Sequence, residues 1–159
     1  MSEGQKRLFD IQLELLTNEL KSIDGAIRQH DEITKTVKNW AVVTWTASIG
    51  LALKESALQP FVWLTAVVPL VFWIVDGSFR TIQRSFIARV EQISAYLNSS
   101  AFKDAASSGS SIDIPLLSMR VKVKQFRNTL LGTMCFRSVA LLYVGLAACS
   151  VVVWYLRRG

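Results

Sequence analysis

The side chains best suited to binding a ligand through charge gather in the second half of the sequence. Between residues 80 and 137 there are nine basic and three acidic residues, whereas residues 1–38 carry six basic and seven acidic ones. Such a region can bind an anionic ligand or the acidic surface of a partner protein. It can also attract anionic lipid headgroups or pair with the acidic N-terminal helix, and all of these interpretations stay open. The basic residues that share two predicted helical faces are Arg80 and Arg84 on one, and Arg120, Lys124 and Arg127 on the other.

The residue types needed for catalysis or for a metal site form no recognisable pattern. The chain has one histidine, His30, and two cysteines, Cys135 and Cys149, which are predicted to lie on one helix. The sequence has no nucleophile–histidine–acid set and no glycine-rich phosphate loop. We therefore predict that the protein is not an enzyme and uses no metal or cofactor. A nucleic-acid partner is not expected either.

Three long stretches without a charged residue determine the predicted fold class. They cover residues 39–53, 56–75 and 138–156 and have 15, 20 and 19 residues. At about 1.5 Å per helical residue, the two longer stretches span a hydrocarbon core of about 30 Å and the first spans most of it. Only Lys54 and Glu55 separate the first two, which predicts a membrane hairpin. The predicted fold class is all-α, an integral membrane helical bundle whose three long helices extend from the bilayer into the cytosol.

Six segments follow from this pattern. They are a cytosolic, coiled-coil-like helix (1–38), a transmembrane hairpin (39–75, with spans 39–54 and 56–75), a cytosolic helix (76–98), a flexible turn (99–114), a basic cytosolic helix (115–137) and a third transmembrane helix (138–156). Lysine and arginine number six in residues 1–38, nine in 76–137 and three elsewhere. This imbalance predicts a cytoplasmic N-terminus. Because Arg157 and Arg158 would then lie outside, a re-entrant course for residues 138–156 stays open.

The N-terminal helix carries a heptad seam, in which apolar residues recur at alternating spacings of four and three. We predict that this seam joins copies of the chain. Glu14, Glu19 and Asp24 fall off it, as expected for a solvated flank. His30 lies in the seam, where it responds to pH, fixes the register as a polar position or simply faces solvent. The seam residues are Leu13, Leu16, Leu20, Ile23, Ile27 and His30.

Within the spans, one face and two short features could serve packing or conduction. The face bears two hydroxyls, so it can line a wet pathway or let a neighbouring helix approach closely. Pro69 is predicted to kink the second span and act as a hinge. Gly145 and Cys149 form a pair of small residues four apart, which favours close helix packing. The face consists of Thr44, Ala47, Ser48 and Leu51.

A long helix that leads into a tight hairpin at Lys54–Pro60, followed by an exit helix that runs far into the cytosol, resembles the SLATT-type two-span membrane domains of bacterial conflict systems. The resemblance covers residues 5–98. It implies a location in the bacterial inner membrane. It also implies an antiviral effector that oligomerises and permeabilises this membrane when a sensor partner signals phage infection.

Two functions of different classes follow as expectations. The first is an oligomeric pore or membrane-disrupting effector lined by the face of Thr44 and Ser48. One subunit has too few helices to enclose water, so a pore requires a homo-oligomer. The second is a non-conducting membrane scaffold whose cytosolic helices dock a soluble partner.

Overall fold

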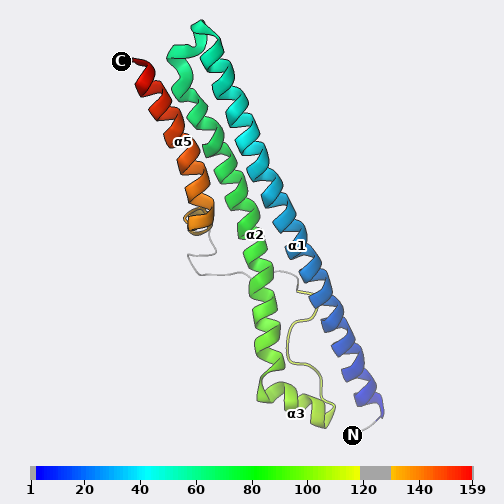
Figure 1. Cartoon of the computed structure of the whole chain (residues 1–159). Helices are drawn as coiled ribbons and strands as arrows, with labels where there is room; N and C mark the ends of the chain where they lie inside the picture. The colour runs from blue at the N-terminus through cyan, green and yellow to red at the C-terminus, as the bar shows by residue number, and fades with distance from the viewer. Residues whose placement is uncertain (1–2, 119–129, 159) are drawn as a thin grey trace. The chain divides into compact units, whose positions relative to one another are not determined.

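Helices make up all the regular secondary structure in the described part of the chain. The structure is a computed structural model that describes residues 3–118 and 130–158. The elements, drawn in Figure 1, are α1 (Glu3–Lys54), the 3-10 helix η1 (Ser56–Ala66), α2 (Val67–Leu97), α3 (Ser100–Ser108), α4 (Leu130–Met134) and α5 (Arg137–Arg158). The predicted all-helical class is thus confirmed. Two compact units are formed: unit 1 comprises residues 1–29 and 82–123, and unit 2 comprises residues 30–81 and 124–159.

Helix α1 runs for 52 residues through the point where the charged N-terminal segment meets the apolar one. The sequence contains no turn signal between residues 37 and 40, so the helical hydrogen bonds continue. Both α1 and α2 contribute residues to each unit. The two units therefore share two helices, and each is described by itself below.

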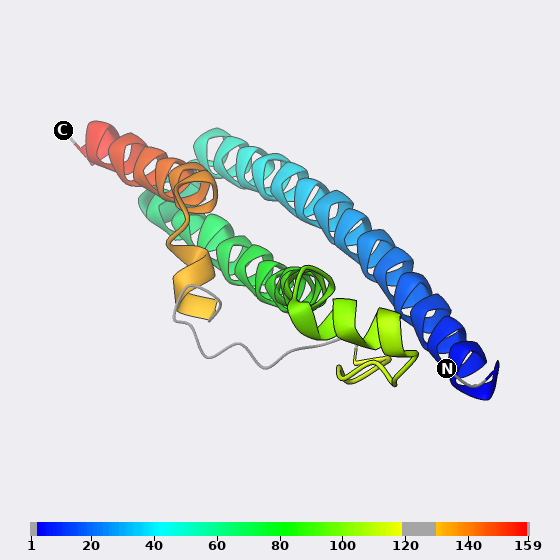
Figure 2. The same ribbon diagram turned by 90° about the horizontal axis from the view of Figure 1, so that it is seen from below.

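Unit 1 is built around an apolar core between the first part of α1 and the last part of α2. The buried members are Leu16, Ile23, Phe86, Ile93, Ile112 and Ile114. The last two come from a non-helical segment that follows α3. Figures 1 and 2 show α3 leaving the end of α2 at an angle. In Figure 1 the chain then folds back between α1 and α2.

The predicted flexible turn at residues 99–114 is wrong in part, because its first half is helical. The Ser99 hydroxyl accepts a hydrogen bond from the Phe102 amide and caps α3 at its start. Gly109 ends α3 with φ of 64°, a left-handed conformation that glycine adopts without a steric penalty. A run of small residues that we took for a loop therefore carries a good N-cap and a good C-cap.

The predicted oligomer seam packs inside the chain. Leu16 and Ile23 are 1% and 0% exposed, respectively, and lie in the core of unit 1. Leu13, Leu20 and Ile27 pack against that core from the side. Leu16 and Ile23 are thus covered within the chain, whereas Leu13, Leu20 and Ile27 are only partly buried. A contact of this seam with a second copy stays a prediction. The periodicity correctly identified the buried face but not what covers it.

Unit 2 contains the reversal at Glu55, which separates α1 from η1. Figure 1 shows the chain turning back there, so that η1 and α2 run antiparallel to α1. Two apolar clusters hold α5 against these helices. Ala41 of α1 meets Val139 and Tyr143 of α5 in one cluster. In the other, the core residues are Ile49, Ala52 and Val62, and Val153 and Trp154 of α5 pack on them.

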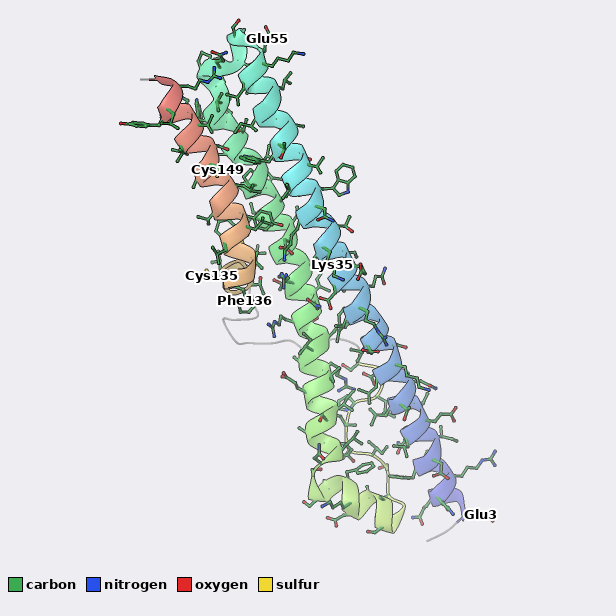
Figure 3. All side chains as sticks on the ribbon, in the orientation of Figure 1. Glu3, Lys35, Glu55, Cys135, Phe136 and Cys149 are labelled. Atoms are coloured by element: carbon green, nitrogen blue, oxygen red, sulfur yellow. The ribbon has the colours of Figure 1, made fainter. Side chains whose placement is uncertain are left out.

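The predicted basic cytosolic helix at residues 115–137 is also wrong at its start and near its end. Residues 115–118 are not helical, and Leu117 has φ of 59°. Helix α4 is described over Leu130–Met134, and a turn at Cys135 and Phe136, both labelled in Figure 3, separates it from α5. Proline is tolerated at a helix start because its missing N–H would be unpaired there, but here the Pro115 carbonyl accepts a hydrogen bond from Arg89. Arg120, Lys124 and Arg127 lie outside the described residues.

Two of the described helices are long and apolar enough to cross a membrane. One runs from Ser56 to Leu97 and the other from Val139 to Arg157, with mean hydropathies of 2.0 and 2.2 in their most apolar windows. Only 17% of each window is buried inside the chain, whereas a core helix of a soluble protein would be mostly covered. The predicted first span, 39–53, is not among them. It has only 15 residues without a charge, so a window of spanning length takes in the charged residues at its ends, Lys38 or Lys54.

Candidate functional site

The first polar cluster of unit 2 joins α2 to α5 at a buried carboxylate. Asp76 is 0% exposed, and its Oδ2 accepts a hydrogen bond from Tyr143 Oη at 3.3 Å. Arg80 Nε lies 3.4 Å from Asp76 Oδ1, and the two residues are four apart on α2. Because Asp76 is buried, its carboxylate depends on both of these partners. The bond from Tyr143 thereby joins α5 to α2.

A second cluster ties three helices together at one hydroxyl. Ser150 Oγ of α5 accepts hydrogen bonds from Trp45 Nε1 of α1 at 2.8 Å and from Thr65 Oγ1 of η1 at 2.9 Å. It donates in turn to the carbonyl of Leu146 at 3.3 Å. Ser150 is fully buried, so these bonds replace those that water would make. The sequence gave no reason to select Ser150, because its partners lie 105 and 85 residues away.

The third cluster packs α4 closely on α2. Thr133 Oγ1 donates to the Gly77 carbonyl at 3.1 Å, and Trp73 Nε1 donates to the Met134 carbonyl at 3.0 Å. A Cβ on Gly77 would meet Met134 Cγ at 2.7 Å and Leu130 Cδ1 at 3.2 Å. Glycine is therefore needed here to allow the close approach of the two helices.

The outward surface of unit 2 contrasts with these buried polar groups. Large apolar side chains are exposed on all of its long elements, including Trp40 (59%), Phe61 (53%), Val71 (53%), Leu141 (74%) and Tyr155 (73%). Figure 3 shows the side chains that surround these helices, with Cys149 labelled on α5. Polar groups inside and apolar groups outside are the arrangement that a hydrocarbon solvent favours.

The predicted pathway face of α1 is only partly turned toward the other helices. The residues that α1 packs inward are Ala41, Trp45, Ile49 and Ala52. Thr44 and Ser48 are half-buried, and Ser48 Oγ donates to the Thr44 carbonyl at 2.8 Å. Ala47 and Leu51 are exposed.

The other residues predicted within the spans, Gly145, Cys149 and Pro69, belong to none of the three polar clusters described above. Gly145 and Cys149 are exposed, and a Cβ on Gly145 would meet nothing within 4 Å. Gly145 belongs to a shallow apolar groove of about 340 Å³ on α5. Pro69 is fully buried at the third residue of α2, directly after the 3-10 helix η1 and within the helical run Ser56–Leu97. The kink and the hinge at this residue stay predictions.

His30 is the one predicted seam residue that belongs to unit 2. It is half-buried, and its ring centroid lies 6.0 Å from that of Phe79 at an interplanar angle of 49°. The imidazole thus packs on an aromatic ring of its own chain. Within the described residues, no group of three His, Cys, Asp or Glu side chains is placed to hold a metal ion.

In unit 1, the main polar feature is a buried ion pair between Glu19 and Arg89. Arg89 Nε donates to Glu19 Oε1 at 2.8 Å and Nη2 donates to Oε2 at 3.2 Å, and the side chains are 1% (Arg89) and 0% (Glu19) exposed. Arg89 Nη1 also binds Gln92 Oε1 at 3.0 Å. We expected Glu19 on a solvated flank. Glu19 lies three residues after Leu16 and four before Ile23, which places it on the same helical face as these buried residues. In the sequence, this spacing was the one indication that Glu19 is buried.

Comparison with known proteins does not extend these observations. No protein-family model, curated protein or solved structure matches the chain. The resemblance to SLATT-type domains therefore stays a prediction.

Proposed function

We propose that the protein is a non-conducting membrane scaffold, in which unit 2 is embedded in the bilayer and unit 1 docks a soluble partner in the cytosol. The observation that carries this proposal is the opposite polarity of the two surfaces. Unit 2 exposes large apolar side chains and buries Asp76, Ser150 and Thr133. Unit 1 buries an apolar core and exposes charged side chains, among them Lys6, Asp10, Glu14, Lys21, Arg28, Glu91 and Lys103.

The hydrogen bonds of unit 2 also favour a scaffold over a pore. The hydroxyls of Ser150, Thr65 and Thr133 bond within the subunit. Ser48 donates to its own helix. A water-filled lining needs polar groups that turn outward along a span, whereas the hydroxyls of Ser150, Thr65 and Thr133 join helices within the subunit.

The test of the scaffold compares partner recovery with membrane leakage. Tagged full-length protein and a variant that lacks residues 1–30 are purified from the same membranes after mild cross-linking. The full chain should recover a specific cytosolic protein and leave liposomes impermeable to ions. The truncated chain should lose that protein, because the deletion removes Leu16 and Ile23 from the core of unit 1. Recovery of the same protein by both chains would contradict the proposal.

A second function, an oligomeric membrane-disrupting effector, draws support from a different observation. Ala47, Gly145 and Cys149 are exposed, and a Cβ on Gly145 would meet nothing within 4 Å. Small residues on a lipid-facing surface allow close contact with a neighbouring helix. Ion flux through liposomes tests this function. The double variant Thr44→Leu with Ser48→Leu should abolish flux, and Thr46→Leu, which removes an exposed hydroxyl from another face of α1, should preserve it.

A further inference from the structure

Residues 110–118 of unit 1, which we call the strap, lie between α1 and α2 as a bound peptide would. The strap is not helical. Its side chains at Ile112 and Ile114 are 6% and 8% exposed and belong to the core, whereas Asp113 between them is exposed. Alternate side chains therefore enter the groove, as in an extended peptide on a receptor.

The first half of the strap is bound through its main chain by side chains from both helices. Gln12 Oε1 of α1 accepts a hydrogen bond from the Ile112 N–H at 2.8 Å. Tyr96 Oη of α2 accepts one from the Asp113 N–H at 3.0 Å. Contacts of this kind recognise an extended backbone and leave the choice of side chains to the apolar positions.

The buried ion pair binds the second half of the strap. Glu19 Oε2 accepts a hydrogen bond from the Leu117 N–H at 2.9 Å, and Arg89 Nη2 donates to the Pro115 carbonyl. Leu117 has φ of 59° and is 65% exposed, so its side chain gains little burial while its backbone is in a conformation that leucine disfavours. Release of the strap would relieve this strain.

The groove has room beyond its present occupant. A hollow of about 210 Å³ adjoins the end of the strap and is lined by Leu15, Asn18, Glu19, Ser22 and Leu117.

We propose that this groove is a docking site for an extended peptide of a partner protein, with branched apolar side chains two residues apart followed by proline. The strap occupies the site until such a peptide displaces it. The inference rests on the scaffold function proposed above and names the chemistry of its partner. A second copy of the chain is a less suitable source of this peptide. Only Ser110 and Ser111 link its strap to the cap of α3 at Gly109, so α3 would have to move with it.

The test uses a labelled synthetic peptide of residues 110–118 and the full-length protein in nanodiscs. In the variant Ile112→Ser with Ile114→Ser, the strap loses its apolar anchors and the peptide should bind. The intact protein should bind the peptide with an affinity at least about tenfold lower, because only the molecules whose strap is released have an open groove. The variant Asp113→Ser, which keeps both isoleucines, is the matched control and should behave as the intact protein does. A peptide with serine at both isoleucine positions should not bind.

A second measurement does not depend on the folding of any variant. At the highest soluble peptide concentration, displacement of the strap in the intact protein should accelerate hydrogen exchange at the Ile112, Asp113 and Leu117 amides. Unchanged exchange, equal binding to the intact and variant proteins, or binding of the serine peptide would each overturn the inference. A strap variant that dimerises instead of binding peptide would also overturn it, in favour of exchange between copies. If the full-length protein still recovers a cytosolic protein while the peptide fails to bind, the docking site is rejected and the scaffold function is retained.

Discussion

The carboxylate of Glu19 and the guanidinium of Arg89 form two parallel hydrogen bonds across 70 residues of sequence, with both side chains out of contact with solvent. Each partner also makes a hydrogen bond to the strap. Arg89 donates to the Pro115 carbonyl, and Glu19 accepts a hydrogen bond from the Leu117 amide. A buried pair with its remaining hydrogen-bonding groups occupied fixes the geometry of its surroundings, even where its net stabilisation is small.

Removal of one member of this pair should destabilise unit 1 strongly. Arg89→Ala leaves a buried carboxylate without its cation, and such losses cost about 3–5 kcal/mol. The loss can be measured by native-state hydrogen exchange at the amides of Phe86 and Ile93. Arg28→Ala is the matched control, because Arg28 and its partner Asp24 are 76% and 58% exposed. We expect almost no effect there. Similar effects of the two substitutions would contradict the importance of burial.

Ser150→Ala should loosen the contact of α5 with α1 and η1. The change leaves the indole N–H of Trp45 without its acceptor, whereas the hydroxyl of Thr65 keeps the Val62 carbonyl as its acceptor. A buried donor that loses its partner costs about 1–3 kcal/mol. Thermal unfolding in mild detergent reports the loss. The control is Ser78→Ala, because Ser78 is exposed and bonds only to its own helix. An equal midpoint for the two variants would argue against Ser150 as a junction.

A larger side chain should be tolerated at Gly145 and not at Gly77. At Gly77 the first added carbon already meets Met134, so Gly77→Leu should separate α4 from α2 at a cost of about 1–3 kcal/mol. Gly145→Leu has open space around it and should leave the unfolding midpoint of the single subunit unchanged. The particle mass of Gly145→Leu carries further information. A smaller particle than that of the natural protein would show that copies meet at this face of α5.

The two free cysteines can report whether α5 is embedded. Both are exposed in the isolated chain, and Cys149 lies within the apolar helix Val139–Arg157 while Cys135 precedes it. In a bilayer, lipid should shield Cys149 from a charged, impermeant maleimide. Cys135 should react from the cytoplasmic side only. Single-cysteine chains, made with Cys135→Ser or Cys149→Ser, are labelled in inside-out and right-side-out vesicles. Rapid labelling of Cys149 in both would contradict a membrane-embedded α5.

The sequence predicted what periodicity and charge determine locally. The unbroken course of α1, the reversal near Glu55 and the inward face of Leu16 and Ile23 follow from such patterns. The cover of that face could not be predicted, because Ile112 and Ile114 lie about a hundred residues away and their segment has no secondary structure of its own.

The polar sites were harder to predict for a related reason. Glu19, Asp76 and Ser150 are common residues at unremarkable spacings, and their burial depends on partners from distant helices. The absence of a helix at residues 115–118 could not be predicted, because a proline fits several local structures. At Pro115 it is the hydrogen bond from Arg89 that holds a non-helical segment in place.

The hydrogen bond between Gln12 and the amide of Ile112 also constrains how the protein is made, since it joins residues 100 positions apart. At about 5–20 residues per second, ribosomes need roughly 5–20 s to add that length of chain. During this interval the apolar face around Leu16 and Ile23 has been synthesised but lacks its cover. The hairpin at Glu55 emerges well before Ile112, so membrane insertion can begin before unit 1 is able to close. The nascent N-terminal helix is therefore a natural client for a holding chaperone.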